Sequence, residues 1–254
     1  MSTTISKLSN LEAINKALMD AMEADPTVLM LGEDVADPEE GGVVGVTRGL
    51  STRFGDHRVR STPISEQAII GAAIGASLAG YRPVAEIMLM NFTTVAMDMI
   101  VNHAAKLRFM SGGQTHVPIT IRMMTGTGFA AGGQHSDYLE AWFAHTPGLK
   151  VVTPWDAADC YGLLRSCIDD PDPCIFVENG PTYFNKWSVD EELAPIPLGK
   201  AAILREGSDI TIVSYSRVLS EAVAAAETPA AGGNLAEGIN PRAGQPWGPG
   251  KGFR

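Results

Sequence analysis

The segment Thr62-Pro-Ile-Ser-Glu-Gln-Ala-Ile-Ile-Gly-Ala-Ala-Ile-Gly-Ala-Ser77 carries the strongest structural signal in the chain. Ser65 has the side chain of a helix N-cap, and Glu66 follows it in the first turn. Gly71, Gly75 and the alanines between them leave a helix face that another backbone can approach closely. We therefore predict a helix from Ser65 to Ala79 that packs tightly against a neighbour.

Two interpretations of Glu66 are open on local sequence. An acidic residue in a first turn often does no more than complement the helix dipole. Because this helix is apolar and lined with small residues, its beginning is alternatively expected in a partly dry cleft, where a carboxylate is perturbed by burial. The second interpretation makes Glu66 a candidate functional residue.

Outward from this helix, short apolar runs alternate with helical patterns. Ser9 and Glu12 form a capping box that opens an amphipathic helix. The remaining predicted elements are strands at 28–31, 83–87, 117–122, 149–152 and 174–177, and helices at 92–109 and 156–168. Strands rich in Val and Ile that alternate with helices predict an α/β fold, a parallel sheet with helices on both faces. Ligands bind such sheets at the carboxyl ends of the strands.

The pattern changes near residue 188. We predict one domain over residues 1–187, an acidic, proline-bearing linker over 188–205, and the beginning of a second domain over 206–227. Its first strand is expected at Asp209–Ser214 and a helix at Ser220–Glu227. Residues 228–254 are dominated by Gly, Pro, Ala and Asn, and we expect them to lack order.

Composition excludes several classes of protein. The 254 residues carry a formal net charge of −10 without a run of Lys or Arg, which argues against nucleic-acid binding. The N-terminus lacks the apolar core of a signal peptide, and no window approaches the roughly 18 apolar residues of a membrane span. We expect a cytoplasmic protein that contacts no membrane. Cys160, Cys167 and Cys174 fit neither a disulfide framework nor a zinc site, and we interpret them as reduced packing residues.

A glycine-rich loop follows the predicted strand at 117–122. Its Gly126-Thr-Gly-Phe-Ala resembles a dinucleotide-binding pattern only superficially, since no helix opens directly after it. His135 lies further along the loop and is either a solvated side chain or a positioned acid or base. A Ser-His-Asp triad is a poor fit because no GxSxG motif occurs, and His145 is too distant in sequence for a zinc pair.

A larger set of motifs occurs in one order along the chain. They are Leu31-Gly-Glu-Asp-Val, Gly41-Gly-Val-Val-Gly-Val-Thr-Arg-Gly-Leu, Thr62-Pro-Ile-Ser-Glu, Gly80-Tyr-Arg-Pro-Val-Ala-Glu, Asn102-His-Ala-Ala-Lys-Leu-Arg-Phe-Met-Ser-Gly-Gly, Gln134-His-Ser, His145-Thr-Pro-Gly-Leu-Lys-Val-Val and Asp170-Pro-Asp-Pro. From Leu11 to about Glu227 the chain resembles the beta subunit of the thiamine-diphosphate-dependent first component of 2-oxo acid dehydrogenase complexes.

The resemblance implies a role for each matching residue. Glu66 would contact the ring nitrogen of the cofactor's pyrimidine and favour the imino tautomer that generates the reactive ylide. Ile64, Met88 and Phe92 would pack around this ring, with Phe92 stacked on it. His135 would lie at the substrate end and act in acyl transfer. Some members also bind potassium through main-chain carbonyls, here those of Ile119, Cys167, Ile168, Asp170 and Asp172.

The resemblance also implies partners. The chain lacks a GDG motif followed by an Asn-rich segment, which in this family marks the alpha subunit that holds the diphosphate through magnesium. An alpha-two beta-two heterotetramer, a lipoyl acyltransferase core and a small 2-oxo acid substrate are therefore implied, with the 71–75 face as a candidate contact.

The C-terminal part departs from the family pattern. Members continue through a full second domain, so we expect a truncated chain whose activity depends on how much of that domain it retains. Two alternatives stay open: an inactive fragment that folds its first domain but does not assemble, and another transketolase-like enzyme such as an acetoin-cleaving dehydrogenase.

Overall fold

The computed structural model describes residues 5–190, 192–227 and 235–245. The first part of the chain alternates strands and helices, as the sequence predicts. In order, its elements are β1 (Ile5–Ser9), α1 (Asn10–Ala24), β2 (Val28–Gly32), η1 (Asp37–Glu39), α2 (Leu50–Phe54), β3 (Val59–Ser61), α3 (Glu66–Leu78), β4 (Arg82–Leu89), η2 (Met90–Phe92), α4 (Thr93–Asp98), η3 (Met99–Ala104), α5 (Leu107–Met110), β5 (Thr120–Thr125), α6 (Glu140–Ala144), β6 (Lys150–Val152), α7 (Ala157–Asp169), β7 (Cys174–Asn179), η4 (Gly180–Thr182) and β8 (Lys186–Asp190).

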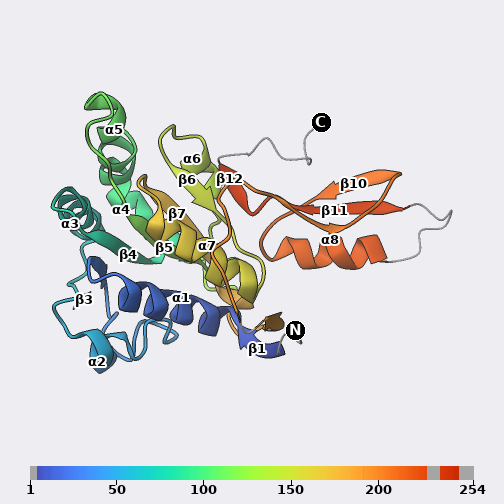
Figure 1. Cartoon of the computed structure of the whole chain (residues 1–254), viewed down its shortest axis with the longest axis horizontal. Coiled ribbons are helices and arrows are strands. Elements are labelled where there is room, and N and C mark those ends of the chain that lie inside the picture. The colour runs from blue at the N-terminus through green and yellow to red at the C-terminus, as the bar shows by residue number, and fades with distance from the viewer. Residues whose placement is uncertain (1–4, 191, 228–234, 246–254) are drawn as a thin grey trace.

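The centre of the molecule is a seven-stranded sheet of order β12-β6-β7-β5-β4-β2-β3 (Figure 1). Six of these strands run parallel, and β12 (Ala243–Gln245) joins the edge antiparallel to β6. Because parallel strands end at the same edge of a sheet, the segments that follow β2, β3, β4 and β5 meet there. This arrangement brings the sequence motifs together.

Both faces of the sheet are buried. In β7, Cys174 and Phe176 join the core cluster built from α1 and α7, whereas Ile175 and Val177 join the opposite cluster with α3 and η3. Alternation of side chains along a strand explains why all four residues are apolar. The predicted α/β class and parallel sheet are confirmed.

A second, smaller unit follows β8. It contains β9 (Ala202–Arg205), β10 (Ile210–Val213), α8 (Val218–Glu227) and β11 (Ala236–Asn240), with the three strands in the order β10-β11-β9 (Figure 1). The unit is attached to the main sheet by buried polar contacts. Asp159 of α7 accepts hydrogen bonds from Asn240 Nδ2 at 2.8 Å and Arg242 Nε at 2.7 Å.

Two expectations about the second half differ from the structure. The predicted linker at 188–205 begins inside β8, which pairs with β1, and ends in β9. Order was not expected after Glu227, yet β11 pairs with β10 and β12 pairs with β6. Local sequence conceals these strands because both are stabilised by partners distant in the chain. The other residues of 228–254 lie outside the described ranges.

The prediction of one continuous helix at 92–109 is wrong. In the structure this segment is divided into η2, α4, a π-helical segment η3 and α5. The chain around Gly148 approaches this region so closely that an added Cβ would lie 2.0 Å from the carbonyl oxygen of Ala105. Such tertiary contacts are invisible in local periodicity. None of the helices among the described residues is long and apolar enough to cross a membrane.

Candidate functional site

Several side chains named from the sequence gather at the carboxyl edge of the parallel strands. Glu33 follows β2 directly, and Glu66 begins the helix that follows β3. Met88 lies near the end of β4, Phe92 ends η2, and His135 belongs to the loop after β5. Because β3, β2, β4 and β5 are neighbours in that order, these residues lie along one edge of the sheet.

Two carboxyl groups form the acidic part of this edge. The residues Glu66 and Glu33 are only 8% and 9% exposed. Burial, reinforced by the nearby charge of Glu66, raises the pKa of Glu33 above its ordinary value. Among the residues that the structure describes, no side chain or backbone group forms a hydrogen bond or ion pair with the Glu66 carboxylate. A buried carboxylate without a protein partner is available to a ligand.

An aromatic ring and an imidazole lie further along the edge. The rings of Phe92 and His135 meet edge to face, with centroids 5.4 Å apart and planes at 84°. Both side chains are partly buried. The structure therefore brings together two residues that are separated by more than forty positions in the sequence, and the prediction that they belong to one site is consistent with this contact.

The loop that bears His135 is fixed by hydroxyl and amide groups. Thr125 Oγ1 donates to the Asp137 carbonyl at 2.8 Å, and Thr127 Oγ1 donates to the Ser136 carbonyl at 2.6 Å. Asn91 Nδ2 donates to Asp137 Oδ2 at 2.6 Å. These three residues were not singled out from the sequence, although Asn91 directly precedes the candidate Phe92.

Gly126 explains how the loop returns toward the strand end. A Cβ at this position would lie 1.9 Å from the carbonyl oxygen of His135, closer than any real contact. The glycine therefore serves the close approach of two backbones rather than a dinucleotide. The next helix begins only at Glu140, so the loop also lacks the helix that a dinucleotide fingerprint requires.

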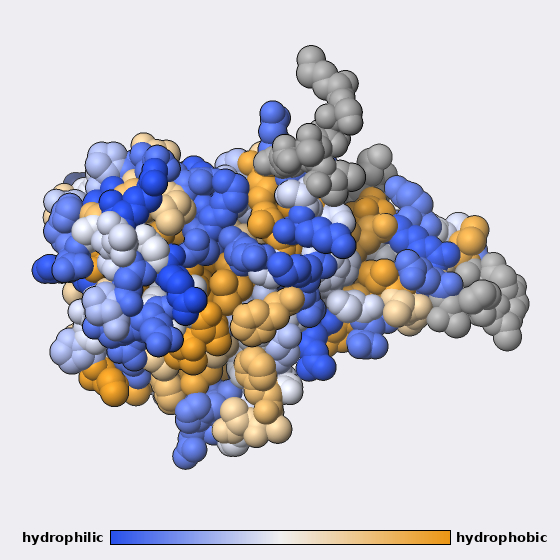
Figure 2. All heavy atoms as spheres, turned by 90° about the horizontal axis from the view of Figure 1, so that it is seen from below, coloured by the Kyte–Doolittle hydropathy of each residue, from blue (hydrophilic) through white to orange (hydrophobic). Residues whose placement is uncertain are grey.

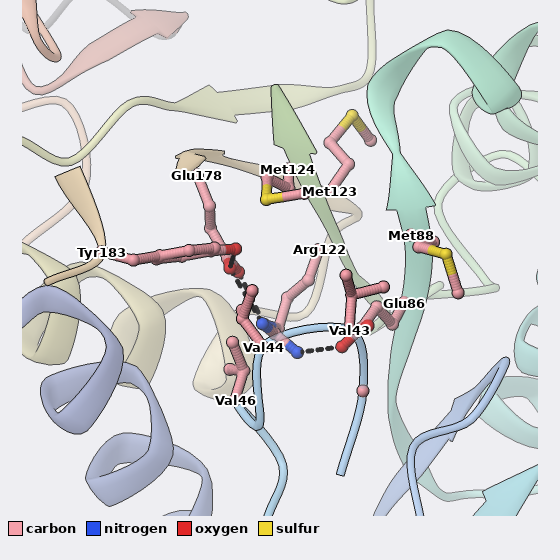
Figure 3. A pocket seen from close by; sticks show the side chains of 11 residues that line it. Val43, Val44, Val46, Glu86, Met88, Arg122, Met123, Met124, Glu178 and Tyr183 are labelled. Carbon is pink, nitrogen blue, oxygen red and sulfur yellow. Dashed lines mark hydrogen bonds and ion pairs between the residues drawn. The ribbon is translucent and has the colours of Figure 1, made fainter. Parts of the chain in front are cut away.

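A buried ion network underlies the centre of the edge (Figure 3). Arg122 Nε and Nη2 donate to the two oxygens of Glu178 at 2.7 and 2.9 Å, and its Nη1 donates to Glu86 Oε2 at 2.6 Å. Tyr183 donates to Glu178 Oε2 at 2.5 Å. Met88 projects from β4 beside this network and lines the same small cavity as the loop residues Val43 and Val44 (Figure 3).

The ion pairs of this network shift the pKa values of its buried groups. Although burial opposes the charge of Arg122, the carboxylates of Glu178 and Glu86 hold its pKa above the usual value. Burial raises the pKa of Glu86, and Arg122 opposes this shift. An Arg in a predicted buried strand was the sequence signal that could have revealed the network.

Ile64 differs from the other three predicted ring contacts. Its side chain is 82% exposed, so within this chain it does not enclose the site. Other strongly exposed large apolar side chains are those of Phe109, Met110 and Phe184. Figure 2 shows apolar surface, interrupted by hydrophilic side chains, on the face seen from below. Exposed apolar groups of this kind are typical of a surface that contacts another protein.

The two glycines on the predicted small-residue face of α3 have different surroundings. An added Cβ at Gly71 would contact Met99 Sδ at 3.6 Å, so this glycine packs against η3. At Gly75 nothing among the described residues lies within 4 Å. The Gly75 side of α3 is therefore open for a further contact.

The carbonyls predicted to hold potassium already accept hydrogen bonds. Arg82 Nη1 donates to the carbonyls of Ile168 and Asp170 at 3.0 and 3.4 Å. The carbonyls of Ile119 and Cys167 accept the backbone N–H groups of Cys174 and Asp170. The Asp172 carbonyl lies 3.6 Å from Cys174 Sγ. No cluster of three or more His, Cys, Asp or Glu side chains suited to a metal occurs in the described part of the chain.

The sequence and fold were compared with known proteins. Residues 6–184 match the model of the transketolase pyrimidine-binding domain, and residues 199–249 match that of the transketolase C-terminal domain. The second match extends beyond Glu227, so the resemblance continues into the segment that we expected to depart from the family.

Relatives with assigned names are beta subunits. The chain is 47% identical to the acetoin:2,6-dichlorophenolindophenol oxidoreductase subunit beta of Cupriavidus necator, over 93% of this chain and 72% of that protein. It is 43% identical to the mitochondrial pyruvate dehydrogenase E1 component subunit beta-2 of Oryza sativa subsp. japonica, over 92% of this chain and 63% of that protein. The 3-methyl-2-oxobutanoate dehydrogenase subunit beta of Mycobacterium tuberculosis is also 43% identical, over 87% and 63%.

Solved structures show the same fold. A split-gene transketolase described as an inactive beta4 tetramer superposes with a TM-score of 0.75 at 20% identity, over 93% of this chain and 72% of that one. The R525L transketolase mutant of Pichia stipitis superposes with a TM-score of 0.69 at 19% identity, over 94% and 35%. With a pyrimidine-binding match across most of its length and relatives above 40% identity, this chain belongs to the transketolase family, in the group of dehydrogenase beta subunits.

Proposed function

We propose that the chain is the beta subunit of a thiamine-diphosphate-dependent 2-oxo acid dehydrogenase, an oxidoreductase that is active only with an alpha subunit. The observation that carries this proposal is Glu66, an almost fully buried carboxylate with no partner among the described residues, at the strand edge where such folds bind ligands. When bound, thiamine diphosphate supplies the carbon nucleophile that permits loss of carbon dioxide from a 2-oxo acid.

With thiamine diphosphate bound, Glu66 would hold a proton at the ring nitrogen of the pyrimidine. Its near-complete burial limits competition from water for this contact. A carboxyl group so placed can exchange a proton with the ring without leaving its position at the start of α3.

The other residues orient the ring and the reacting atoms. Phe92 offers an aromatic face, and Met88 offers a polarisable thioether that adapts to the ring outline. Ile64 is too exposed to enclose the ring within this chain alone, and it fits a position that is closed by the alpha subunit. His135, held against Phe92, moves a proton at the substrate end during acyl transfer.

An alpha subunit would hold the diphosphate and its magnesium ion and would complete an alpha-two beta-two heterotetramer. Support comes from the exposed apolar side chains and from the open side of α3 at Gly75. The acyl group would then pass to a lipoyl acyltransferase core. Potassium at the carbonyls of Ile119, Cys167, Ile168, Asp170 and Asp172 remains part of the proposal, because each carbonyl oxygen retains a second lone pair.

Acetoin cleavage is the second candidate. The acetoin relative from Cupriavidus necator is 47% identical, whereas the pyruvate and 3-methyl-2-oxobutanoate relatives are 43% identical. The chain spans only 63% of the length of the rice and mycobacterial relatives, so an assay has to identify the substrate. The cytoplasmic location is likewise a prediction; the rice relative is named mitochondrial.

The test is reconstitution with the cognate alpha subunit, thiamine diphosphate and magnesium. Turnover of pyruvate, 3-methyl-2-oxobutanoate and acetoin is measured with 2,6-dichlorophenolindophenol as acceptor. We expect turnover of one of these substrates and a loss of about 10²–10⁴-fold in Glu66→Gln. Glu206→Gln, at an exposed carboxylate between β9 and β10 of the smaller unit, serves as the matched control and should keep full activity.

Three results would contradict parts of the proposal. A stable alpha–beta complex without turnover of any substrate would contradict the proposed activity, and a folded chain that neither associates nor turns over would support the inactive-fragment alternative. Near-full activity of Glu66→Gln would remove the assigned role of this carboxyl. Failure of the chain to associate with the alpha subunit would contradict the proposed heterotetramer.

A further inference from the structure

A second cavity lies between the main sheet and the smaller unit. It has a volume of about 510 Å³, and none of Glu66, Met88, Phe92 and His135 is among its lining residues. The main domain contributes Thr127, Tyr138 and Asn179, and the smaller unit contributes Val213–Val218 and Glu221. Asn179 ends β7 and Thr127 follows β5, so the cavity lies at the carboxyl ends of two parallel strands, where α/β folds bind ligands.

Buried polar atoms in the wall lack partners. The residues Ser216 and Asn179 are 3% and 7% exposed, and Ser216 Oγ and Asn179 Oδ1 form no hydrogen bond with any described residue. The Tyr138 hydroxyl lies near Ser216, but neither hydroxyl forms a hydrogen bond of acceptable geometry. Buried polar groups are normally paired, so their convergence on one cavity indicates a polar ligand.

The donors in this wall suit an anion. Arg217 has no ion-pair partner among the described residues, and it lies against Gly128, where an added Cβ would be 2.3 Å from its Nη1. Val218 begins α8, so the positive end of that helix faces the same space. Burial raises the pKa of Tyr138, which therefore remains a hydroxyl donor at neutral pH. Glu221 is the one carboxylate among the lining residues.

Part of the wall is apolar. The rings of Tyr138 and Tyr215 are stacked with centroids 6.3 Å apart and planes at 22°, and Val213 and Val218 flank them. The Tyr215 hydroxyl is occupied, because it donates to Glu140 Oε1 at 2.9 Å. A ligand in this cavity would therefore meet donors at Arg217 and Ser216 and hydrocarbon at the valines and the tyrosine rings.

We propose that this cavity binds a small aliphatic carboxylate, with its carboxyl group at Arg217, Ser216 and Tyr138 and its hydrocarbon part against the valines. The site is connected to the loop of His135, because the Thr127 hydroxyl donates to the Ser136 carbonyl. Occupancy of the cavity would thus stabilise the position of that loop.

The experiment is isothermal titration calorimetry of the full chain with isobutyrate, without alpha subunit or thiamine diphosphate. Isobutyramide, which has the same shape without the charge, is titrated in parallel. We expect saturable one-to-one binding of isobutyrate. The affinity for isobutyramide should be lower by about tenfold or more. Absence of saturable isobutyrate binding, or equal binding of the amide, would overturn the proposal.

Variants locate the binding. Arg217→Met should weaken isobutyrate binding by about tenfold or more, whereas Lys200→Met, an exposed cation of the smaller unit outside the cavity, should not change it. Tyr138→Phe keeps the stacked ring and removes only the hydroxyl, so it tests the site even if Arg217→Met folds poorly. Unchanged binding in Tyr138→Phe together with unchanged binding in folded Arg217→Met would contradict the assignment.

Discussion

At the residue scale, the site depends on a few side chains held in unusual surroundings. Glu66 is buried without a partner in the part of the chain that the structure describes, and His135 is held against Phe92 by a loop that glycine and threonine residues fix in place. Each of these residues leads to a separate prediction about function.

His135 should act at the substrate end rather than in cofactor binding. We predict that His135→Ala lowers the rate of acyl transfer to a lipoyl acceptor by about 10²–10⁴-fold and leaves thiamine diphosphate binding nearly unchanged. Steady-state kinetics and calorimetry on the reconstituted complex measure the two effects. His145→Ala, at an exposed histidine, is the control. Unchanged lipoyl kinetics in His135→Ala would show that the imidazole has no role.

Gly126 should be the least replaceable residue of the loop. In Gly126→Ala the new Cβ would collide with the His135 carbonyl, so the loop must move at a cost of about 1–3 kcal/mol. Gly133→Ala in the same loop meets nothing within 4 Å and should be nearly neutral. Urea unfolding of both variants measures the difference. Equal stability of the two variants would contradict the predicted collision.

Candidate site residues were easier to predict from the sequence than the residues that support them. Glu66 and His135 stand in recognisable motifs, and in the structure they and Phe92 lie along one edge, while their chemical roles stay predictions. The hydrogen bonds of Asn91, Thr125 and Thr127 connect loops that meet only in the folded chain, so no local pattern reveals them. The exposure of Ile64 could not be predicted either, because it depends on which parts of the folded chain lie around this side chain.

At the scale of elements, three neighbouring strands are joined by charge. Arg122 of β5 lies between Glu86 of β4 and Glu178 of β7, and all three are in the sheet interior below the site (Figure 3). The network holds the strand ends in one relative position, because each carboxylate requires the central guanidinium.

Arg122→Met should therefore be strongly destabilising. It leaves two buried carboxylates without a counter-charge, which costs about 3–5 kcal/mol of unfolding free energy. Arg60→Met, at an exposed residue of β3, is the control. Urea unfolding checks the prediction, and replacing Glu86 and Glu178 with Gln in the Arg122→Met background should restore part of the loss. A loss below about 1 kcal/mol in Arg122→Met would contradict the assigned role.

The elements themselves were predictable where periodicity is strong. The helices α1, α3 and α7 and the strands β2, β4, β6 and β7 follow from apolar pattern and capping. The π-helical segment η3 and the strands β11 and β12 could not be predicted in this way. The π-helical segment is packed against a neighbouring part of the chain, and the two strands pair with strands that are distant in the sequence.

At the scale of the whole molecule, a buried carboxylate is one of the groups that hold the smaller unit to the main domain. Asp159 of α7 accepts from Asn240 and Arg242, and burial together with the charge of Asp156 raises its pKa to about 6. The folded chain therefore holds a proton on Asp159 more tightly than the unfolded chain, whose ordinary pKa is 3.8.

This shift predicts a pH dependence with a definite sign. Unfolding free energy should fall as pH rises from about 4 to about 6, by at most about 3 kcal/mol from this group, because the favourable protonated form is lost. Asp159→Asn should lack this component. Urea unfolding of both proteins across that range measures it. Parallel stability curves for the two proteins would contradict the prediction.

The proposed function depends on one carboxyl group, that of Glu66, at the proposed boundary with an alpha subunit. The most direct measurement is a crystal structure of the alpha–beta complex with thiamine diphosphate bound. We predict a Glu66 carboxyl oxygen about 2.6–3.2 Å from a ring nitrogen of the pyrimidine, with Phe92 against the ring. A Glu66 side chain turned into solvent, or a pyrimidine bound elsewhere on the complex, would contradict the account.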